Sequence, residues 1–254
     1  MRRTLIGGTV AAVAVTVSML TAGPALAVAH GTPAQPGQYR FAAKLVMTGI
    51  PRPDGSHYDS GCSGALVSPS WVITAGHCFH DANRVRVSGP VPYPTTVTVD
   101  TVEVTKNPGR TVDVVSVQQA PAGDVSLARL AHPVFGVPTL AISNQAPELG
   151  DIVRIAGWGA TSSVDPAPGL QLNTGQFTVS SVDPTAIGVD GYRPYPDTSA
   201  CLYDSGAPYF AESAHHRPQL VSVESDGPDC PHTGAETTGR TDTLIGWIFT
   251  TIWS

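Results

Sequence analysis

Basic side chains are scarce in this sequence, and so are charged side chains in general. Lys and Arg together make up 14 of the 254 residues, and Asp, Glu, Lys and Arg make up only 13% of the chain. The sequence has no basic run, which argues against a nucleic-acid-binding protein. After residue 27 it also has no apolar stretch of about 20 residues, the length that a membrane-spanning helix requires. We therefore expect the mature protein to bind neither nucleic acids nor membranes.

The first 27 residues have the pattern of an export signal. Residues 1–3 (MRR) are basic, residues 4–20 are uncharged and mostly apolar, and residues 25–27 (ALA) fit the small-residue pattern of signal peptidase. A membrane anchor is the rival interpretation, but the apolar stretch is short for a spanning helix. We expect a signal peptide over residues 1–27 and a secreted, extracellular protein, with the general or the twin-arginine route left open. Cleavage before Val28 would leave 227 residues and, because two arginines are lost, a formal charge of −8 instead of −6.

The remaining chain is rich in short β-type segments separated by turn residues, and strong helical periodicity is absent until its end. Such spacing is typical of β-barrels and β-sandwiches. A helix is expected only over Asp242–Ser254, where Leu244, Ile245 and Ile248 can share one apolar face. The expected strands are Phe41–Ile50, Gly64–Ile73, Arg84–Val87, Thr95–Val104, Val112–Val117, Val125–Leu130, Ile152–Ala156, Gly175–Val182 and Leu220–Glu224.

The sequence has only four cysteines, at positions 62, 78, 201 and 230. An even number in an exported chain predicts disulfides, and four cysteines allow three connectivities. Cys62–Cys78 and Cys201–Cys230 would each close a local loop. No Cys-x-x-Cys or histidine spacing supports a metal site, so we expect no metal ion.

Segment 201–208 reads CLYDSGAP and has the composition of a turn that can present a reactive serine. A serine hydroxyl needs a base to accept its proton and backbone N–H groups to stabilise the oxyanion. The small residues after Ser205 leave its oxygen uncrowded. A plain turn is the alternative, because Asp, Ser, Gly and Pro all favour turns.

Two upstream segments supply the groups that such a serine requires. Residues 74–78 (TAGHC) follow a β-rich segment, and they place His77 beside a cysteine. Imidazole can accept and return a proton near neutral pH. Asp124 precedes the alternating segment 125–130, and a carboxylate there can orient the imidazole and stabilise its charged form.

These segments, in the order His77, Asp124, Ser205, resemble those of the trypsin/chymotrypsin-like serine proteases of the secreted, bacterial type. Residues 156–159 (AGWG), residues 220–230 (LVSVESDGPDC) and the final helix extend the resemblance over nearly the whole mature chain. The resemblance implies an all-β fold of two packed six-stranded antiparallel Greek-key barrels with a C-terminal helix. The N-terminal barrel would span residues 28–140 and the C-terminal barrel with its helix residues 141–254. Both local cysteine pairs match disulfides of the family.

The resemblance also implies a role for each matching residue. His77 would be the general base, Asp124 its orienter and Ser205 the nucleophile. The backbone N–H groups of Tyr203 and Ser205 would form the oxyanion hole, and Asp204 would receive the amine of Val28. The remaining matches concern substrate binding: Ser225, Asp226 and Gly227 along the substrate backbone, and Ser199, Gly227 and Gly239 at the floor and walls of the first specificity pocket.

Three residues depart from the family pattern. Tyr203 replaces a glycine, and if the backbone there needs a positive φ, the tyrosine costs on the order of 1–3 kcal/mol. Ala207 also replaces a glycine, and Asp226 replaces a tryptophan of the substrate groove. With Ser199 supplying no negative charge, we expect cleavage after large apolar or aromatic residues.

The resemblance implies a monomeric serine endopeptidase that acts on peptide or protein substrates without a cofactor. A binding module with a spoiled oxyanion hole and a secreted esterase are the alternatives. No propeptide separates the signal from Val28, so signal peptidase itself would create the activating terminus. The rival interpretation is cleavage after Ala29, which would make His30 the first residue of the mature protein.

Overall fold

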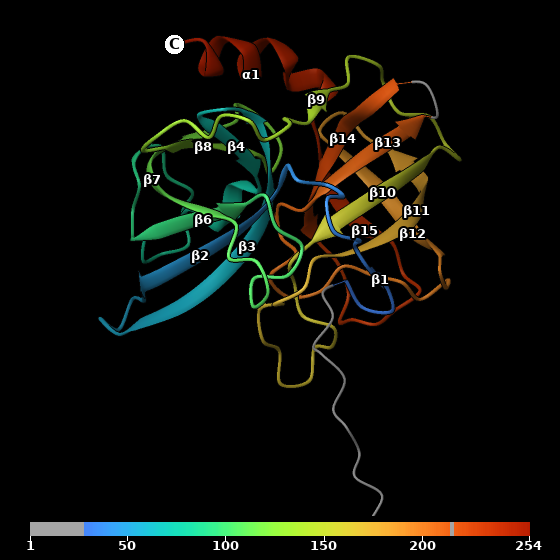
Figure 1. Cartoon of the computed structure of the whole chain (residues 1–254), viewed down its shortest axis with the longest axis horizontal. Coiled ribbons are helices and arrows are strands. Elements are labelled where there is room, and N and C mark those ends of the chain that lie inside the picture. Colours follow the sequence, from blue (N-terminus) through green and yellow to red (C-terminus); the bar gives the residue numbers. More distant parts are fainter. Residues whose placement is uncertain (1–27, 214–215) are drawn as a thin grey trace, which may run out of the picture.

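The computed structural model describes residues 28–213 and 216–254, which form two β-barrels lying side by side (Figure 1). The export signal expected over residues 1–27 lies outside the described residues. Among the described residues, no helix has the length and apolarity needed to cross a bilayer.

The first barrel is a six-stranded antiparallel sheet that closes through the pairing of β7 with β8. The short strand β5 (Gly89–Pro90) extends β7 outside the closed ring. The six strands, in spatial order, are β7 (Arg110–Gln119), β6 (Thr95–Val99), β2 (Ala42–Pro51), β3 (His57–Ser68), β4 (Trp71–Thr74) and β8 (Ser126–Leu130).

The second barrel is closed in the same way, through β11 and β12. Its strands, in spatial order, are β11 (Asn173–Val182), β10 (Ile152–Gly157), β13 (Pro208–Ser213), β14 (His216–Asp226), β15 (Glu236–Arg240) and β12 (Ala186–Arg193). Two short strands add to it: β1 (Thr32–Pro33) pairs with β11, and β9 (Ala141–Ile142) runs parallel to β14. The expected fold of two six-stranded antiparallel barrels is therefore confirmed.

The barrels are filled by apolar side chains that point inward from the strands. One large buried cluster fills the first barrel and continues between the barrels, and a second cluster fills the C-terminal barrel. Val28 belongs to the second cluster, and β1 pairs with a strand of the second barrel. Residues 28–33 therefore pack on the C-terminal barrel, although the expected boundary assigned them to the N-terminal one.

The C-terminal helix is shorter than expected. A 3₁₀ turn over Asp242–Leu244 leads into α1 (Ile245–Ile252), which lies along one end of the molecule (Figure 1). Leu244 and Ile248 are buried in the large cluster that fills the first barrel. The helix therefore follows the second barrel in sequence and packs its apolar face on the cluster that joins the two barrels.

Candidate functional site

His77 lies on a short 3₁₀ turn, η1 (Gly76–Cys78), which directly follows β4. The Cys62–Cys78 disulfide ties this turn to β3, as the resemblance implied. The Ser126 hydroxyl on β8 donates a hydrogen bond to the carbonyl of Ala75 at 3.0 Å. The turn is therefore fixed from two neighbouring strands, and the backbone of His77 is held in one place.

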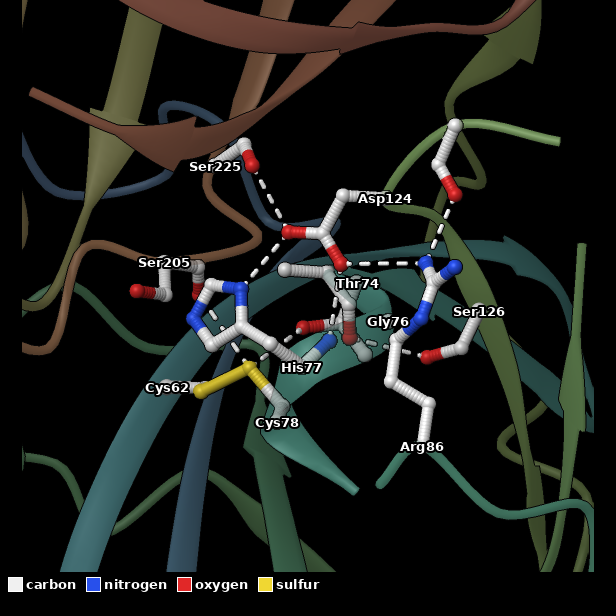
Figure 2. A network of polar contacts seen from close by, with 12 residues as sticks. Cys62, Thr74, Gly76, His77, Cys78, Arg86, Asp124, Ser126, Ser205 and Ser225 are labelled. Atoms are coloured by element: carbon white, nitrogen blue, oxygen red, sulfur yellow. Dashed lines mark hydrogen bonds and ion pairs between the residues drawn. A yellow bond between two sulfur atoms is a disulfide. The ribbon is translucent and has the colours of Figure 1, made fainter. Parts of the chain in front are cut away.

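His77 and Asp124 form a close, two-point contact (Figure 2). The Asp124 Oδ1 atom accepts the backbone N–H of His77 at 2.8 Å, and Oδ2 lies 2.6 Å from His77 Nδ1. Ser225, on β14 of the other barrel, donates its hydroxyl to the same Oδ2 at 2.7 Å. Burial alone would raise the pKa of Asp124, but the hydrogen bonds and charge of His77 and the Ser225 hydroxyl outweigh it and lower the pKa to about 2. The carboxylate therefore stays ionised, and the geometry calls for a proton on Nδ1 of the imidazole.

Arg86 is a further neighbour of Asp124 that sequence reasoning missed. Its Nη1 donates to the carbonyl of Gly123 at 2.6 Å and lies 3.4 Å from Asp124 Oδ1 (Figure 2). The segment around Arg86 was expected to be a strand, but its β pairing is a single bridge to His80. No local motif marks this arginine, because only the folded loop brings it to the aspartate.

Ser205 lies on the side of the His77 ring opposite Asp124 (Figure 2). His77 and Ser205 both line a hollow of about 180 Å³. The backbone carbonyl of Ser205 accepts the N–H of Ser63 at 2.8 Å, which anchors the serine to β3. The next residue, Gly206, has a φ of +84°, and a Cβ there would lie 2.0 Å from Thr74 Oγ1. Glycine at position 206 is therefore required by the close approach of this loop to β4.

Tyr203 occupies the left-handed region of backbone space, with a φ of +75°. The backbone there does require a positive φ, which disfavours a side chain. The hydroxyl of Ser63 donates to the Tyr203 carbonyl at 3.1 Å, and Ser63 itself receives the backbone N–H of Trp158 at 2.9 Å. Ser63 thus braces the strained peptide from β3, a role that the sequence did not reveal.

Asp204 is fully buried beneath the serine loop. Its carboxylate accepts backbone N–H groups from Gly159 at 2.8 Å, from Cys201 at 3.1 Å and from Val28. Burial nevertheless raises the pKa of Asp204 to about 7, because three neutral donors do not replace a positive charge. A Cβ at Gly157 or Gly159 would lie 2.0 to 2.4 Å from the carboxylate, which explains the Gly-Trp-Gly segment.

A pocket of about 130 Å³ opens beside Ser205. Ser225, Asp226 and Gly227 line it, in the region where substrate binding was expected. Ser199 and Gly239, expected at the floor and wall of the first specificity pocket, are not among the described residues that line this hollow.

Each of these two residues makes other contacts. The Ser199 side chain is buried and accepts the backbone N–H of His232 at 3.3 Å. Gly239 lies against Asp124 and Val125, whose nearest atoms are 2.8 to 3.0 Å from the position of an added Cβ.

The pocket instead receives two glutamates that sequence reasoning did not consider. Glu224 and Glu236 both line it and both have side chains that are almost completely buried. Burial raises the pKa of Glu236 to about 8, and it raises the pKa of Glu224 well above its usual range. The Cys201–Cys230 disulfide, which the resemblance also implied, closes the loops around this pocket. Within the described part of the chain, no group of three or more His, Cys, Asp or Glu residues is arranged to hold a metal ion.

Comparison with known families gives one match that covers most of the chain. The family described as Trypsin matches residues 28–248. Among individual proteins, glandular kallikrein of Sus scrofa is 32% identical over 124 residues, which are 44% of this chain and 49% of the kallikrein. Trypsin iota of Drosophila melanogaster is 28% identical over 195 residues, covering 66% of this chain and 69% of that protein.

For two of these relatives the matched segment covers less than half of either protein. The match with a snake venom serine protease of Bothrops jararaca is 31% identical and spans 41% of this chain and 40% of that protein. The chain therefore spans less than half of the kallikrein and of the venom protease. Among solved structures, mouse neuropsin, a serine protease, superposes with a TM-score of 0.68 over 89% of this chain and 100% of its own, at 19% identity. At that identity the superposition shows a shared fold.

Proposed function

Because this chain belongs to the trypsin family of serine proteases, we propose that it is a serine-type endopeptidase that cleaves peptides or proteins through an acyl-enzyme on Ser205. The observation that carries this proposal is the line of contacts from Ser225 through Asp124 to His77, with Ser205 on the far side of the imidazole ring (Figure 2). The histidine is oriented by an ionised carboxylate, and its second ring nitrogen is left for the serine.

In the proposed reaction His77 accepts the proton of Ser205 as the hydroxyl oxygen attacks the scissile carbonyl. The imidazolium then gives this proton to the leaving amine, and the acyl group remains on Ser205. A water molecule, activated by the same histidine, hydrolyses the ester and restores the serine. Asp124 stays ionised throughout and stabilises the imidazolium, consistent with its lowered pKa of about 2.

The oxyanion would be held by the backbone N–H groups of Tyr203 and Ser205. A left-handed backbone at position 203 supports this proposal, because the tyrosine adopts a conformation that a side chain disfavours. The bracing bond from Ser63 to the Tyr203 carbonyl keeps the peptide in place. Preorganised donors of this kind contribute about 3 kcal/mol or more each to lowering the barrier.

The exposed edge formed by Ser225, Asp226 and Gly227 would pair with the extended backbone of the substrate. The expected preference for large apolar side chains needs revision, because its premise was a first pocket without acidic groups. Glu224 and Glu236 line that pocket. The acidic lining of the pocket therefore bears on which substrate side chains it accepts.

The remaining proposals concern the environment and activation of the enzyme. We infer a secreted, extracellular monomer of bacterial type that needs no cofactor. Processing before Val28 would place a free amine where its backbone N–H now meets Asp204. An ammonium group there would supply the positive charge that the buried carboxylate lacks.

Labelling with a fluorophosphonate tests the proposed nucleophile. We expect covalent labelling of Ser205, and substitution Ser205→Ala should abolish both the labelling and peptide hydrolysis. His77→Ala should remove nearly all activity, and the double variant should be hardly worse, because the two residues act as a unit. If the losses of activity in the two single variants instead multiplied in the double variant, the assignment of Ser205 and His77 to one catalytic unit would be contradicted.

The same experiments separate the alternatives. The strained Tyr203 favours, as a second candidate, a binding module that has lost its oxyanion hole. No labelling at saturating fluorophosphonate would support that candidate. Rapid hydrolysis of a short-chain ester with no cleavage of casein would instead identify an esterase.

A further inference from the structure

The pocket beside Ser205 is strongly acidic. Its lining includes four acidic residues, and no Lys, Arg or His occurs among the described residues that line it. The four are Glu224, Asp226, Asp229 and Glu236. Asp226 and Asp229 are exposed at the rim, whereas the two glutamates are only 3% and 1% exposed. Buried carboxylates without a cationic partner are costly, so their presence in a substrate pocket calls for an explanation.

The two carboxyl oxygens of Glu236 have different surroundings: one accepts a backbone hydrogen bond, and the other lies against Gly227 in the pocket wall. Its Oε1 accepts the backbone N–H of Ala200 at 2.7 Å and lies 3.2 Å from His232 Nε2. Its Oε2 lies against Gly227, within 1.7 Å of the position where a Cβ would stand. Gly227 is also a residue of the exposed substrate-binding edge. The carboxyl group of Glu236 therefore occupies the space beside the point where a substrate side chain enters.

His232 does not neutralise Glu236 permanently. Its Nδ1 lies 3.1 Å from the carbonyl of Gly234, an acceptor, so Nδ1 carries a proton. Burial lowers the pKa of His232, which favours a neutral ring with an unprotonated Nε2. A neutral Nε2 carries no proton to donate and has no hydrogen-bond partner among the described residues, so a neutral His232 supplies no positive charge to Glu236.

Glu224 is the second buried acid, and its partner is uncharged. The phenol of Tyr209 donates to Glu224 Oε2 at 2.9 Å, and both side chains are buried. The charged and titratable groups that face Glu236 from the surrounding segments are His232, Asp204, Glu224, Asp226 and Tyr209. Four of the five can only be neutral or negative, and each negative charge disfavours ionisation of Glu236.

We propose that the protonation state of Glu236 determines whether this pocket accepts a cationic or an uncharged substrate side chain. As a carboxylate it pairs with the cationic end of a lysine or arginine preceding the scissile bond. As a carboxylic acid it leaves an uncharged pocket, which admits an apolar or aromatic side chain. Binding of a cationic side chain to the protonated form expels the proton to water, so the charge of the pocket stays balanced. This inference rests on the proposed protease function and assigns the specificity of that same site.

The pH dependence follows from the direction of the shift. Because burial raises the pKa of Glu236 to about 8, the carboxylate becomes populated as pH rises toward 8. For two peptides that differ only in Lys or Phe before the scissile bond, the kcat/KM ratio of Lys to Phe should therefore rise about tenfold per pH unit below that value. Because the Lys peptide uses the carboxylate and the Phe peptide the acid, the ratio follows their populations and should rise roughly 100-fold between pH 6 and pH 8. The ratio cancels any pH dependence of the catalytic step that the two peptides share.

The experiment measures this ratio from pH 5.5 to 9 for the wild-type protein, for Glu236→Gln and for Glu148→Gln. Glu148 is exposed and does not line the pocket, so it is the matched control and should reproduce the wild-type curve. In Glu236→Gln the ratio should become independent of pH and should be lower than wild type by at least tenfold at pH 9. Continued hydrolysis of the Phe peptide by that variant shows that it is folded.

A flat ratio in the wild-type protein, or a rising ratio that survives Glu236→Gln, would overturn the inference. If Glu236→Gln cleaves neither peptide, the wild-type curve decides alone, with a rise supporting the inference and a flat line overturning it. Fluorophosphonate labelling in the same samples tests the nucleophile independently of the role of Glu236. Labelled Ser205 with a flat ratio removes the role of Glu236 and leaves the protease function intact, whereas unlabelled Ser205 contradicts the protease function itself.

Discussion

Tyr203 shows how one residue can hold a strained backbone in a functional loop. Its φ of +75° lies where side chains are disfavoured, and the Ser63 hydroxyl holds its carbonyl in place. The ring also packs near Gly61, where a Cβ would lie 3.7 Å from Tyr203 Cδ1. The surrounding structure thus enforces a conformation that the residue itself opposes, which is the condition under which strain persists at a site.

Substitution Tyr203→Gly should relieve this strain while keeping the backbone N–H. We expect the turnover number to change by less than about tenfold, or under 1.4 kcal/mol, and the free energy of unfolding to rise by about 1 kcal/mol. Tyr192→Gly is the control, because Tyr192 has no positive φ and glycine should there destabilise the strand. A gain in turnover of a hundredfold or more would mean that the tyrosine cripples the natural protein.

At the scale of elements, the loop before β13 packs closely against the end of β10 and the residues after it, because glycines there leave room for the contact. Gly157 and Gly159 surround the Asp204 carboxylate, and Gly206 lies against Thr74 on β4. The serine loop of the second barrel is thereby pressed onto a strand of the first. The glycines around it are required by contact distances, and this requirement predicts which substitutions the site tolerates.

Gly159→Ala should strongly destabilise the protein. Its new Cβ would lie 2.4 Å from the Asp204 carboxylate and 2.8 Å from the Asp204 backbone nitrogen, so the buried loop must shift. We expect a loss of about 3 kcal/mol or more in the free energy of unfolding, measured in urea. Gly246→Ala is the matched control, because Gly246 lies in α1 and a Cβ there meets no atom within 4 Å. That variant should be more stable by about 0.5 kcal/mol, and equal losses in both would contradict this account.

The elements also show which features the sequence could predict. His77, Asp124 and Ser205 each lie in a short contiguous sequence motif, so they could be singled out as candidate site residues without the fold. The position of Glu236 could not be inferred in this way, because it depends on how β15 pairs with β14. That pairing has a register irregularity between Glu224 and Asp226.

The strands that escaped prediction have a common cause. β12, β13 and β15 have weak apolar alternation, as in the sequence ETTGR of β15, and they form because neighbouring strands of the closed barrel pair with them. The expected strand Gly64–Ile73 is divided between β3 and β4 by a turn at Pro69-Ser70. The sequence showed the apolar run there but not the hairpin within it.

At the scale of the whole molecule, the first described residues connect the start of the chain to the serine loop. Val28 is buried in the core of the second barrel, and its φ of +53° is an outlier for a β-branched residue. Ala29 accepts the backbone N–H of Ser199 at 3.1 Å, and His30 Nδ1 lies 3.0 Å from Asp197. Cleavage before Val28 would release its φ from the preceding peptide and convert its N–H into an amine beside Asp204.

This conversion should reverse the effect of pH on the loop. With a peptide bond before Val28, the folded pKa of Asp204 is about 7, above its unfolded value near 4. Stability should then fall as pH rises from about 4 to 7, because the folded state holds the proton more tightly. A free amine pairs with the ionised carboxylate, and its own folded pKa is raised above an unfolded value of about 8. Its contribution is full below that value and is lost as pH climbs through the folded pKa.

We therefore expect the form that begins at Val28 to be active near neutral pH and to lose activity in alkali. A form with a single alanine ahead of Val28 should keep its barrels folded but lose activity, because the buried carboxylate then lacks its ammonium partner, a loss of about 3–5 kcal/mol. N-terminal sequencing identifies which form the purified protein has, and thermal unfolding from pH 4 to 9 measures the two opposite trends. Full activity of the extended form, or of a form that begins at His30, would show that the amine of Val28 does not order the site.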